Sequence, residues 1–380
     1  MKNVVIAGYA RSPFTPAFKG ELAGVRPDEL VAQVITALVH ESGIDPNDIE
    51  DLILGCAFPE GEQGLNLARL VGHLAQLPVS IAGVTVNRFC GSSMQAIHIA
   101  AGAIQMNAGD AFICAGVESM SREPMGGFNM LPHPDLYRNY PQAYIGMGET
   151  AENLALNYHI ARVDQEAFAL TSQHKAYAAQ QQGLLVDEII PIVTGKGQTV
   201  TQDGCLRPDS TAEGLAELKS AFLLNGSVTA GTSSPLTDGA AAVLVCSEAY
   251  ADKHGLNKLA RIKSIAVSGC LPEIMGIGPV AATQKALYRA GLSLVDIDIV
   301  ELNEAFAAQA LAVLKELPIP AKKLNLDGGA IALGHPLGAS GARITGKAAS
   351  LLQRENKQYA LATQCIGGGQ GIATILEAVS

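Results

Sequence analysis

The chain has 380 residues and 48% of them are hydrophobic, which is enough for more than one packed unit. Charged residues make up 16% and the formal net charge is −10, so neither nucleic acid nor an anionic membrane surface is an expected partner. No apolar run approaches the roughly 18 residues of a membrane-spanning helix, and the N-terminal run resembles a strand, not a targeting segment. We therefore expect a cytoplasmic protein that does not bind a membrane.

The predicted elements alternate between strands and helices along the chain. Helix-period segments lie at 28–40, 93–106 and 164–181, and short apolar runs flanked by glycine lie at 111–115 and 240–245. Buried strands that alternate with helices indicate α/β architecture, with mixed or parallel sheets covered on both faces.

An internal repeat runs through this pattern. Residues 49–58 and 297–306 have matching apolar patterns, each preceded by a glycine and an apolar residue at the same spacing. Residues 110–116 and 359–365 also match, as apolar strands. Similarity at one long offset of 248 positions, from Ile49 to Ile297, predicts a duplication and not a short-period solenoid.

The composition changes between the two halves, where proline, glycine and methionine are concentrated from residue 123 to 148. We predict an N-terminal half at 1–118 plus 238–250, an inserted loop domain over the active site at 119–237, and a C-terminal half at 251–380. Long irregular segments in compact proteins are usually binding loops or lids. A structural spacer is the alternative.

The seven cysteines are an odd number without a C-x-x-C pair or metal-finger spacing. This usage is typical of a reducing compartment, where single thiols are core residues or nucleophiles. Cys114 and Cys246 lie inside apolar runs and are assigned to the core, and we expect the same role for Cys56 and Cys270.

Cys90 is a candidate nucleophile because it lies where an extended run turns sharply into a helix. A thiol at a helix N-terminus faces unpaired N–H groups and the positive end of the dipole, which lowers its pKa and favours the thiolate. A small buried cysteine is the alternative.

Two further candidates lie in glycine-rich segments of the C-terminal half. Cys365 ends an apolar strand and begins the sequence CIGGGQG, whose glycines permit close approach and free N–H groups for an oxyanion hole. His335 precedes a proline in a glycine-rich turn, and histidine is the usual partner of an activated cysteine. A structural histidine is the alternative.

Asn303 and Glu304 stand where a strand enters a helix, a common place for a ligand in α/β folds, although Asn303 could simply cap the helix. The segment 276–281 fits the loose dinucleotide pattern G-x-G-x-x-A. It does not follow the first strand closely, and its proline removes an N–H that a phosphate would need, so we expect no dinucleotide there.

Four stretches, 87–96, 303–309, 328–343 and 365–371, together resemble the signature blocks of the thiolase family. Similarity also covers 11–14 and 230–242, and thus nearly the whole chain. The resemblance implies two duplicated α/β halves in a layered α-β-α-β-α sandwich with an inserted loop domain. It implies an acyltransferase that exchanges acyl groups between 3-ketoacyl-CoA and coenzyme A, nearest to the degradative 3-ketoacyl-CoA thiolases (acetyl-CoA C-acyltransferases) of fatty acid β-oxidation.

The resemblance also implies roles for the candidates. Cys90 matches the nucleophile that carries the acyl group as a thioester, His335 the residue that takes its proton, and Cys365 the general acid/base. His335 and a water held by Asn303 would bind the enolate oxygen, and the N–H groups of Cys90 and Gly367 would hold the tetrahedral oxyanion.

For coenzyme A, which is a substrate here, Ser234 matches a residue that contacts the pantetheine. Met147 and Phe306, with the neighbouring Ala305, match positions beside the acyl and pantetheine channel. Arg207 matches a basic residue near the nucleotide. No metal and no other cofactor is implied, and the family suggests a homodimer or homotetramer.

Two positions depart from the family pattern. Gly146 stands where biosynthetic acetoacetyl-CoA thiolases usually have histidine, which favours a degradative enzyme of broader chain length. Gly204 and Cys205 stand where an acidic pair is expected before Arg207.

Three alternatives remain open. The first is a biosynthetic acetyl-CoA acetyltransferase that makes acetoacetyl-CoA, and the second is a non-catalytic thiolase-like carrier of acyl-CoA or lipid. A carrier has no need for Cys90, Asn303, His335 and Cys365 together. The third, a ketoacyl synthase, would be expected to have histidine in place of Cys365.

Overall fold

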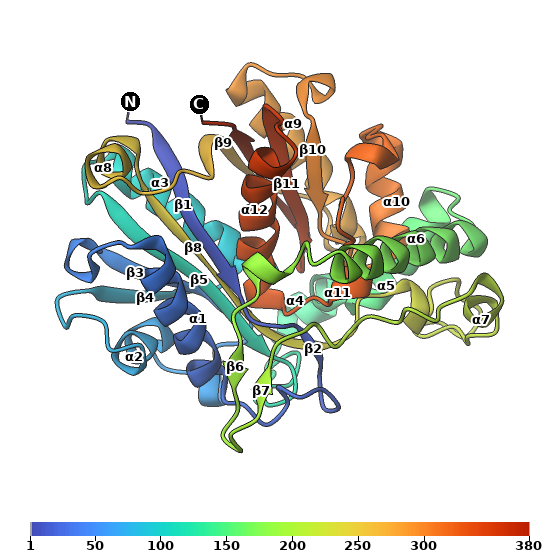
Figure 1. Cartoon of the computed structure of the whole chain (residues 1–380). Coiled ribbons are helices and arrows are strands. Elements are labelled where there is room, and N and C mark those ends of the chain that lie inside the picture. Colours follow the sequence, from blue (N-terminus) through green and yellow to red (C-terminus); the bar gives the residue numbers. More distant parts are fainter. Residues whose placement is uncertain (1, 380) are drawn as a thin grey trace.

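The computed structural model describes residues 2–379 (Figure 1). The N-terminal half of the repeat contains six strands: β1 (Val4–Arg11), β2 (Thr15–Pro16), β3 (Asp51–Gly55), β4 (Ala82–Val86), β5 (Ala111–Ser119) and β8 (Thr237–Ser247). Its helices are α1 (Pro27–Ser42), α2 (Leu67–Leu74), α3 (Ser92–Gln105) and α8 (Glu248–His254). The helices expected at 28–40 and 93–106 and the strands expected at 111–115 and 240–245 are confirmed.

The C-terminal half repeats this pattern. Its strands are β9 (Ala260–Gly269), β10 (Ile299–Leu302), β11 (Tyr359–Ile366) and β12 (Gln370–Glu377). Its helices are α9 (Gly278–Ala290), α10 (Ala307–Glu316), α11 (Ala330–Leu333) and α12 (Leu337–Arg354).

The segment between β5 and β8 has little sheet. It contains α4 (Pro134–Asn139), α5 (Met147–Asn157), α6 (Arg162–Gln181), α7 (Ala212–Ala216) and the two-stranded hairpin of β6 (Ile192–Val193) and β7 (Thr199–Val200). The helix expected at 164–181 is confirmed. The domain boundaries given above stay a prediction.

The strand order shows the duplication directly. The main sheet runs β10-β11-β12-β9-β1-β8-β5-β3-β4, so β10-β11-β12-β9 in one half corresponds to β3-β5-β8-β1 in the other. In both halves a parallel pair is followed by an antiparallel one: β3 with β5 and β5 with β8, then β10 with β11 and β11 with β12. The two halves join where β1 and β9 pair through only two residues each.

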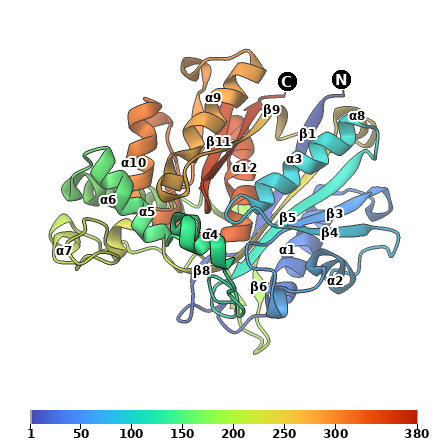
Figure 2. The same cartoon turned by 180° about the vertical axis from the view of Figure 1, so that it is seen from behind.

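Helices and sheet halves form the five expected layers (Figure 2), and apolar side chains fill the spaces between them. One core cluster lies between α1, α2 and the N-terminal strands, and another between α9, α10 and the C-terminal strands. A third cluster surrounds α3 and α12, which lie between the two halves of the sheet. The sequence-based fold class is therefore confirmed, and the two central helices begin where the candidate residues lie.

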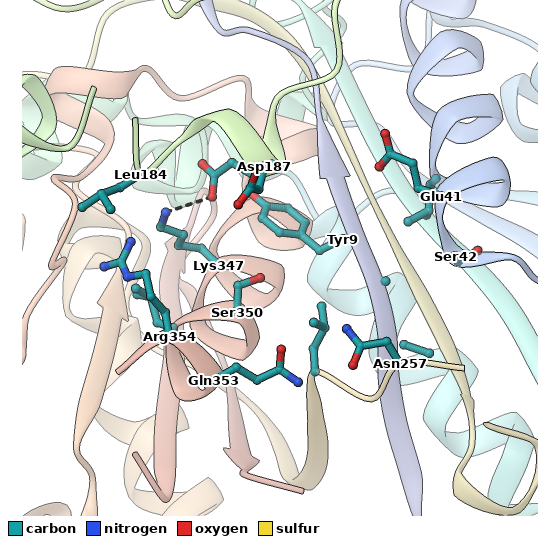
Figure 3. Close-up of a pocket in the computed structure, with 16 residues that line it drawn as sticks. Tyr9, Glu41, Ser42, Leu184, Asp187, Asn257, Lys347, Ser350, Gln353 and Arg354 are labelled. Atoms are coloured by element: carbon teal, nitrogen blue, oxygen red, sulfur yellow. Dashed lines mark hydrogen bonds and ion pairs between the residues drawn. The ribbon is translucent and has the colours of Figure 1, made fainter. Parts of the chain in front are cut away.

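Buried ion pairs connect the segment between the halves to this frame. Arg11 on β1 binds Asp203 with two nitrogens, at 2.7 and 2.8 Å, and Glu188 at 2.8 Å. Lys347 on α12 binds Glu188 at 2.9 Å beside a cavity of about 570 Å³, which Tyr9 and Arg354 also line (Figure 3). These bonds fix the segment over β1 and α12.

The G-x-G-x-x-A segment has a packing role. Gly278 begins α9 against the start of β12, and a Cβ at this position would lie 2.1 Å from the carbonyl oxygen of Gln370. The glycine therefore permits a helix to approach a strand. Throughout residues 2–379, no helix has the length and apolar character that a membrane span requires.

Candidate active site

Cys90 lies in a tight turn between β4 and α3. It precedes Gly91, the N-cap of α3, and follows Phe89, whose φ of +42° is rare for a residue with a side chain. Ser92 closes the turn, since its hydroxyl accepts from the Arg88 N–H at 2.9 Å and donates to the Phe89 carbonyl at 2.6 Å. Cys90 is buried, with 8% of the residue exposed, and it lines a cavity.

The expected low pKa of Cys90 is wrong for the free site. Burial raises the pKa of the Cys90 thiol to about 11, and the N–H groups of Gly367 and of Cys90 itself, which are directed at the sulfur, lower it only in part. Desolvation of the thiolate outweighs the helix N-terminus because the dipole contributes little beyond the first turn and Cys90 is almost fully buried. Cys90 therefore carries its proton until a base removes it.

His335 is the candidate for that base, and it lines the same cavity as Cys90. Burial, reinforced by the positive charge of Arg343, lowers the pKa of His335 to about 3, so the imidazole is neutral. The Ser340 hydroxyl donates to the Pro336 carbonyl at 2.9 Å, which leaves its oxygen to accept from Nδ1 of His335 at 2.6 Å. With its proton on Nδ1, the ring keeps a lone pair on Nε2.

Asn303 lies beside that lone pair. Its Nδ2 is 3.3 Å from His335 Nε2, and its Oδ1 is buried without a hydrogen-bond partner within the described residues. Asn303 does not cap α10, because the helix begins at Ala307 with Phe306 as N-cap. Its Oδ1 can therefore accept one more hydrogen bond, while Asn303 itself is not among the residues that line the cavity described below.

Cys365 is the penultimate residue of β11 and lines the same cavity as Cys90 and His335. Its side chain is fully buried, and burial together with the nearby Cys90 raises the pKa of this thiol well above its usual value. Both thiols are thus protonated at neutral pH, next to a neutral histidine. This combination can transfer protons in either direction without creating a net charge in a dry site.

One cavity of about 390 Å³ connects three of these four residues. Cys90, His335 and Cys365 line it, together with the expected channel residues Met147, Ser234, Ala305 and Phe306. Ser234 donates to the Ala305 carbonyl at 3.0 Å, so its oxygen can still accept from a ligand. The remaining walls are mostly apolar: Met120, Met125, Phe222, Leu236, Met275 and Leu337.

Arg207 does not line this cavity. Its backbone N–H donates to Gln173, and its guanidinium has no carboxylate within ion-pair distance among residues 2–379. A contact with the nucleotide end of coenzyme A, outside the cavity, stays a prediction.

The structure adds two polar residues that the sequence did not reveal as part of the site. One is Ser340, which fixes the tautomer of His335 from five positions further along the chain. The other is Glu118, a buried carboxylate at the end of β5 that accepts from the N–H groups of Ala57 and Gly338, both at 2.9 Å. Glu118 thereby joins the loop after β3 to the first turn of α12. No local pattern marks either residue, because their partners lie in the folded chain.

No group of histidine, cysteine, aspartate or glutamate side chains in the described part of the chain is arranged to hold a metal ion.

Comparisons with known proteins identify the family of the chain. Residues 4–249 match the sequence model of the family "Thiolase, N-terminal domain", and residues 256–378 match that of "Thiolase, C-terminal domain". A 3-ketoacyl-CoA thiolase of Bacillus subtilis (strain 168) is 46% identical over 389 residues, covering 99% of this chain and 100% of the relative. One from Aliivibrio fischeri (strain ATCC 700601 / ES114) is 49% identical over 389 residues, with the same coverage of 99% and 100%.

Two solved structures match over 100% of this chain. The crystal structure of human mitochondrial 3-ketoacyl-CoA thiolase superposes with a TM-score of 0.92 at 39% identity, over 99% of that chain. The structure of the human protein in complex with CoA gives a TM-score of 0.91 at 39% identity, over 98% of that chain. The resemblance seen in the sequence is confirmed: the chain belongs to the thiolase family of acyltransferases.

Proposed function

We propose that this chain cleaves 3-ketoacyl-CoA with coenzyme A, giving acetyl-CoA and a shortened acyl-CoA, as in fatty acid β-oxidation. The main support is that two protonated cysteines and a neutral histidine line one apolar cavity. Thioester exchange needs a nucleophilic thiol, a base to activate it and a second acid to protonate the departing carbon, and this set contains all three.

In the first half-reaction, Nε2 of His335 takes the proton of Cys90, and the sulfur attacks the 3-keto carbon. The N–H groups of Cys90 and Gly367, already directed at this sulfur, bind the developing oxyanion. When the C2–C3 bond breaks, the acyl group stays on Cys90. The enolate of acetyl-CoA leaves, with its oxygen bound by the protonated His335 and by a water that Asn303 holds, and Cys365 delivers a proton to its carbon.

In the second half-reaction, the Cys365 thiolate takes the proton of the incoming CoA thiol. The CoA sulfur attacks the thioester on Cys90, and acyl-CoA leaves. Cys90 recovers its proton from His335, so both cysteines end the cycle as thiols. No other cofactor takes part in this scheme, in which coenzyme A is a substrate.

Gly146 supports a substrate with a longer acyl chain. It lines the cavity as N-cap of α5 with φ of −67°, a conformation open to any residue, and a Cβ there would meet only the Glu149 carboxyl group, at 3.7 Å. The glycine therefore leaves space and is not required by the backbone. This favours thiolytic cleavage of longer substrates over a biosynthetic enzyme confined to acetoacetyl-CoA.

We include a homodimer in the proposal, with a homotetramer as the larger alternative. Strand β4 is an edge of the main sheet, and Val84 on it is 38% exposed. Leu65, Val79 and Phe89 nearby in sequence are also exposed. An uncovered apolar edge strand can pair with the same strand of a second copy. Light scattering after gel filtration measures the assembly.

A cytoplasmic location is also part of the proposal. All seven cysteines are free thiols in the structure, and six of them are buried. This usage suits a reducing compartment.

The test is CoA-dependent cleavage of acetoacetyl-CoA and of a medium- and a long-chain 3-ketoacyl-CoA by the wild type, Cys90→Ser and Cys365→Ser. We expect cleavage of all three by the wild type and loss of turnover in both variants. Activity confined to acetoacetyl-CoA would support the biosynthetic alternative. Tight binding without turnover in the wild type would support the carrier.

A further inference from the structure

Gln364 interrupts an apolar face of β11. Side chains alternate along a strand, and Ala360, Ala362 and Ile366 on the same face belong to the core around α3 and α12. Gln364 between them is fully buried. A polar amide at this position needs a reason, because an apolar side chain would fit the same layer without desolvation cost.

The amide makes one hydrogen bond and lacks another. Its Nε2 donates to the backbone carbonyl of Cys90, whereas its Oε1 is buried without a partner among residues 2–379. A buried acceptor without a partner destabilises the fold. The bond to Cys90 therefore exists in spite of a stability cost.

The bond reaches a turn that needs external support. Phe89 holds φ at +42°, and a Cβ at Gly91 would lie 2.6 Å from Cδ1 of Ile366, so the turn lies directly on β11. Arg88 adds a second bond to the C-terminal half, to Gln370 at 2.8 Å. The nucleophile of one half is thus held by the strand that carries Cys365 in the other half.

We propose that Gln364 is a positioning residue, which holds the Cys90 carbonyl so that the Cys90 sulfur faces Cys365 and the N–H group of Gly367. This inference rests on the proposed function in naming Cys90 as the nucleophile. Gln364 touches no reacting atom. Its effect is to fix the peptide plane after Cys90, and with it the direction of the sulfur, in a turn that would otherwise relax.

The first variant is Gln364→Met, which keeps the length of the side chain and removes the amide. We expect kcat for thiolysis to fall about tenfold, since displacing a reacting group by a fraction of an ångström is costly, with KM for CoA unchanged. The melting temperature should change little, because the loss of the unpartnered Oε1 offsets the loss of the donor to the Cys90 carbonyl. A lower rate with little change in stability distinguishes positioning from a structural role.

Alkylation of Cys90 by iodoacetamide separates this inference from the proposed function, because it requires no turnover. It is followed by mass spectrometry of the Cys90 peptide in a Cys365→Ser background, as a function of pH. In Gln364→Met we expect alkylation several-fold slower, with its midpoint at higher pH, because the N–H groups would no longer be directed at the sulfur. An unchanged alkylation profile, with or without a lower melting temperature, overturns the proposal.

A second variant, Gln364→Glu, decides the question if the methionine variant does not fold. A protonated carboxyl group can donate to the Cys90 carbonyl, whereas a carboxylate cannot. We expect the ratio of the alkylation rate of Gln364→Glu to that of the wild type to be near one at acidic pH and to fall as pH rises. A ratio that is constant with pH contradicts the proposal.

Gln353→Met is the matched control. It removes an exposed amide bonded to the Lys258 carbonyl at 2.7 Å and should change neither the rates nor the alkylation profile.

Discussion

Ser340 Oγ lies 2.6 Å from Nδ1 of His335 and determines which ring nitrogen carries the proton. The hydroxyl's only hydrogen points to the Pro336 carbonyl, at 2.9 Å, so its oxygen accepts from the ring. Because both residues belong to the junction of Pro336 with α12, the first turn of this helix orients the histidine. The base of the proposed reaction thus depends on a serine that touches no substrate.

Replacing this serine should therefore slow the reaction without weakening the binding of CoA. In Ser340→Ala, the histidine can adopt either tautomer, and we expect kcat to fall by about tenfold to a hundredfold, part of what a positioned base supplies. KM for CoA should be unchanged, because Ser340 touches no substrate. Steady-state thiolysis measures both constants.

Ser350→Ala is the control on the same helix. Its hydroxyl donates to the Gly346 carbonyl at 3.1 Å and faces the cavity on the far side of α12 (Figure 3). Equal loss in the two serine variants would contradict a specific role for Ser340.

Gly146 provides a test of chain length. In Gly146→Leu, the new side chain should enter the cavity, because a Cβ at this position meets only the Glu149 carboxyl group. Overpacking costs about 1–3 kcal/mol, so we expect kcat/KM for a long-chain 3-ketoacyl-CoA to fall about tenfold or more. Cleavage of acetoacetyl-CoA should change little.

Gly24→Leu is the corresponding control, since Gly24 is exposed and a Cβ there meets nothing within 4 Å. The ratio of long-chain to short-chain kcat/KM is the quantity to compare. A ratio that is the same in wild type and Gly146→Leu would place the acyl chain elsewhere.

His98 makes stability depend on pH. It is buried on α3, lies 2.8 Å from the Thr374 hydroxyl, and burial lowers its pKa to about 3. The unfolded chain binds a proton near the ordinary pKa of about 6.5, so stability is present above that pH and is lost as pH falls toward 3. The slope is about 1.4 kcal/mol per pH unit for this residue.

Urea denaturation at several pH values between 4.5 and 7.5 measures this slope. We expect His98→Gln to remove the part of the decrease in unfolding free energy at acidic pH that comes from His98. The part that comes from His335 should remain. The exposed His40→Gln on α1 should leave the slope as in wild type. Parallel curves for wild type and His98→Gln would show that His98 does not contribute.

Arg11 is expected to be essential to stability. Arg11→Met leaves the Asp203 and Glu188 carboxylates buried without this partner, which typically costs 3–5 kcal/mol. The matched exposed pair, Arg138 with Asp135 at 3.2 Å, should contribute no more than about 1 kcal/mol when broken by Arg138→Met. Denaturant midpoints compare the two, and similar losses would contradict the buried network as an anchor for the segment between β5 and β8.

The sequence alone determined the architecture and named the candidate reacting groups. The repeat at an offset of 248 positions predicted two similar halves, and the strand order confirms them. Cys90, His335 and Cys365 were recognisable because glycine-rich turns leave a clear local pattern and because the surrounding blocks resemble one family. Such signals are local, so they can be recognised in the sequence without a structure.

Only the tertiary structure decided the protonation states and the supporting contacts. The position before a helix suggested a low pKa for Cys90, but the C-terminal half covers the thiol, and desolvation reverses the direction. Ser340, Glu118 and Gln364 act on groups that are distant in sequence or hidden by strand alternation. Burial and long-range hydrogen bonds depend on how the two halves pack against each other, and no local run of residues contains that information.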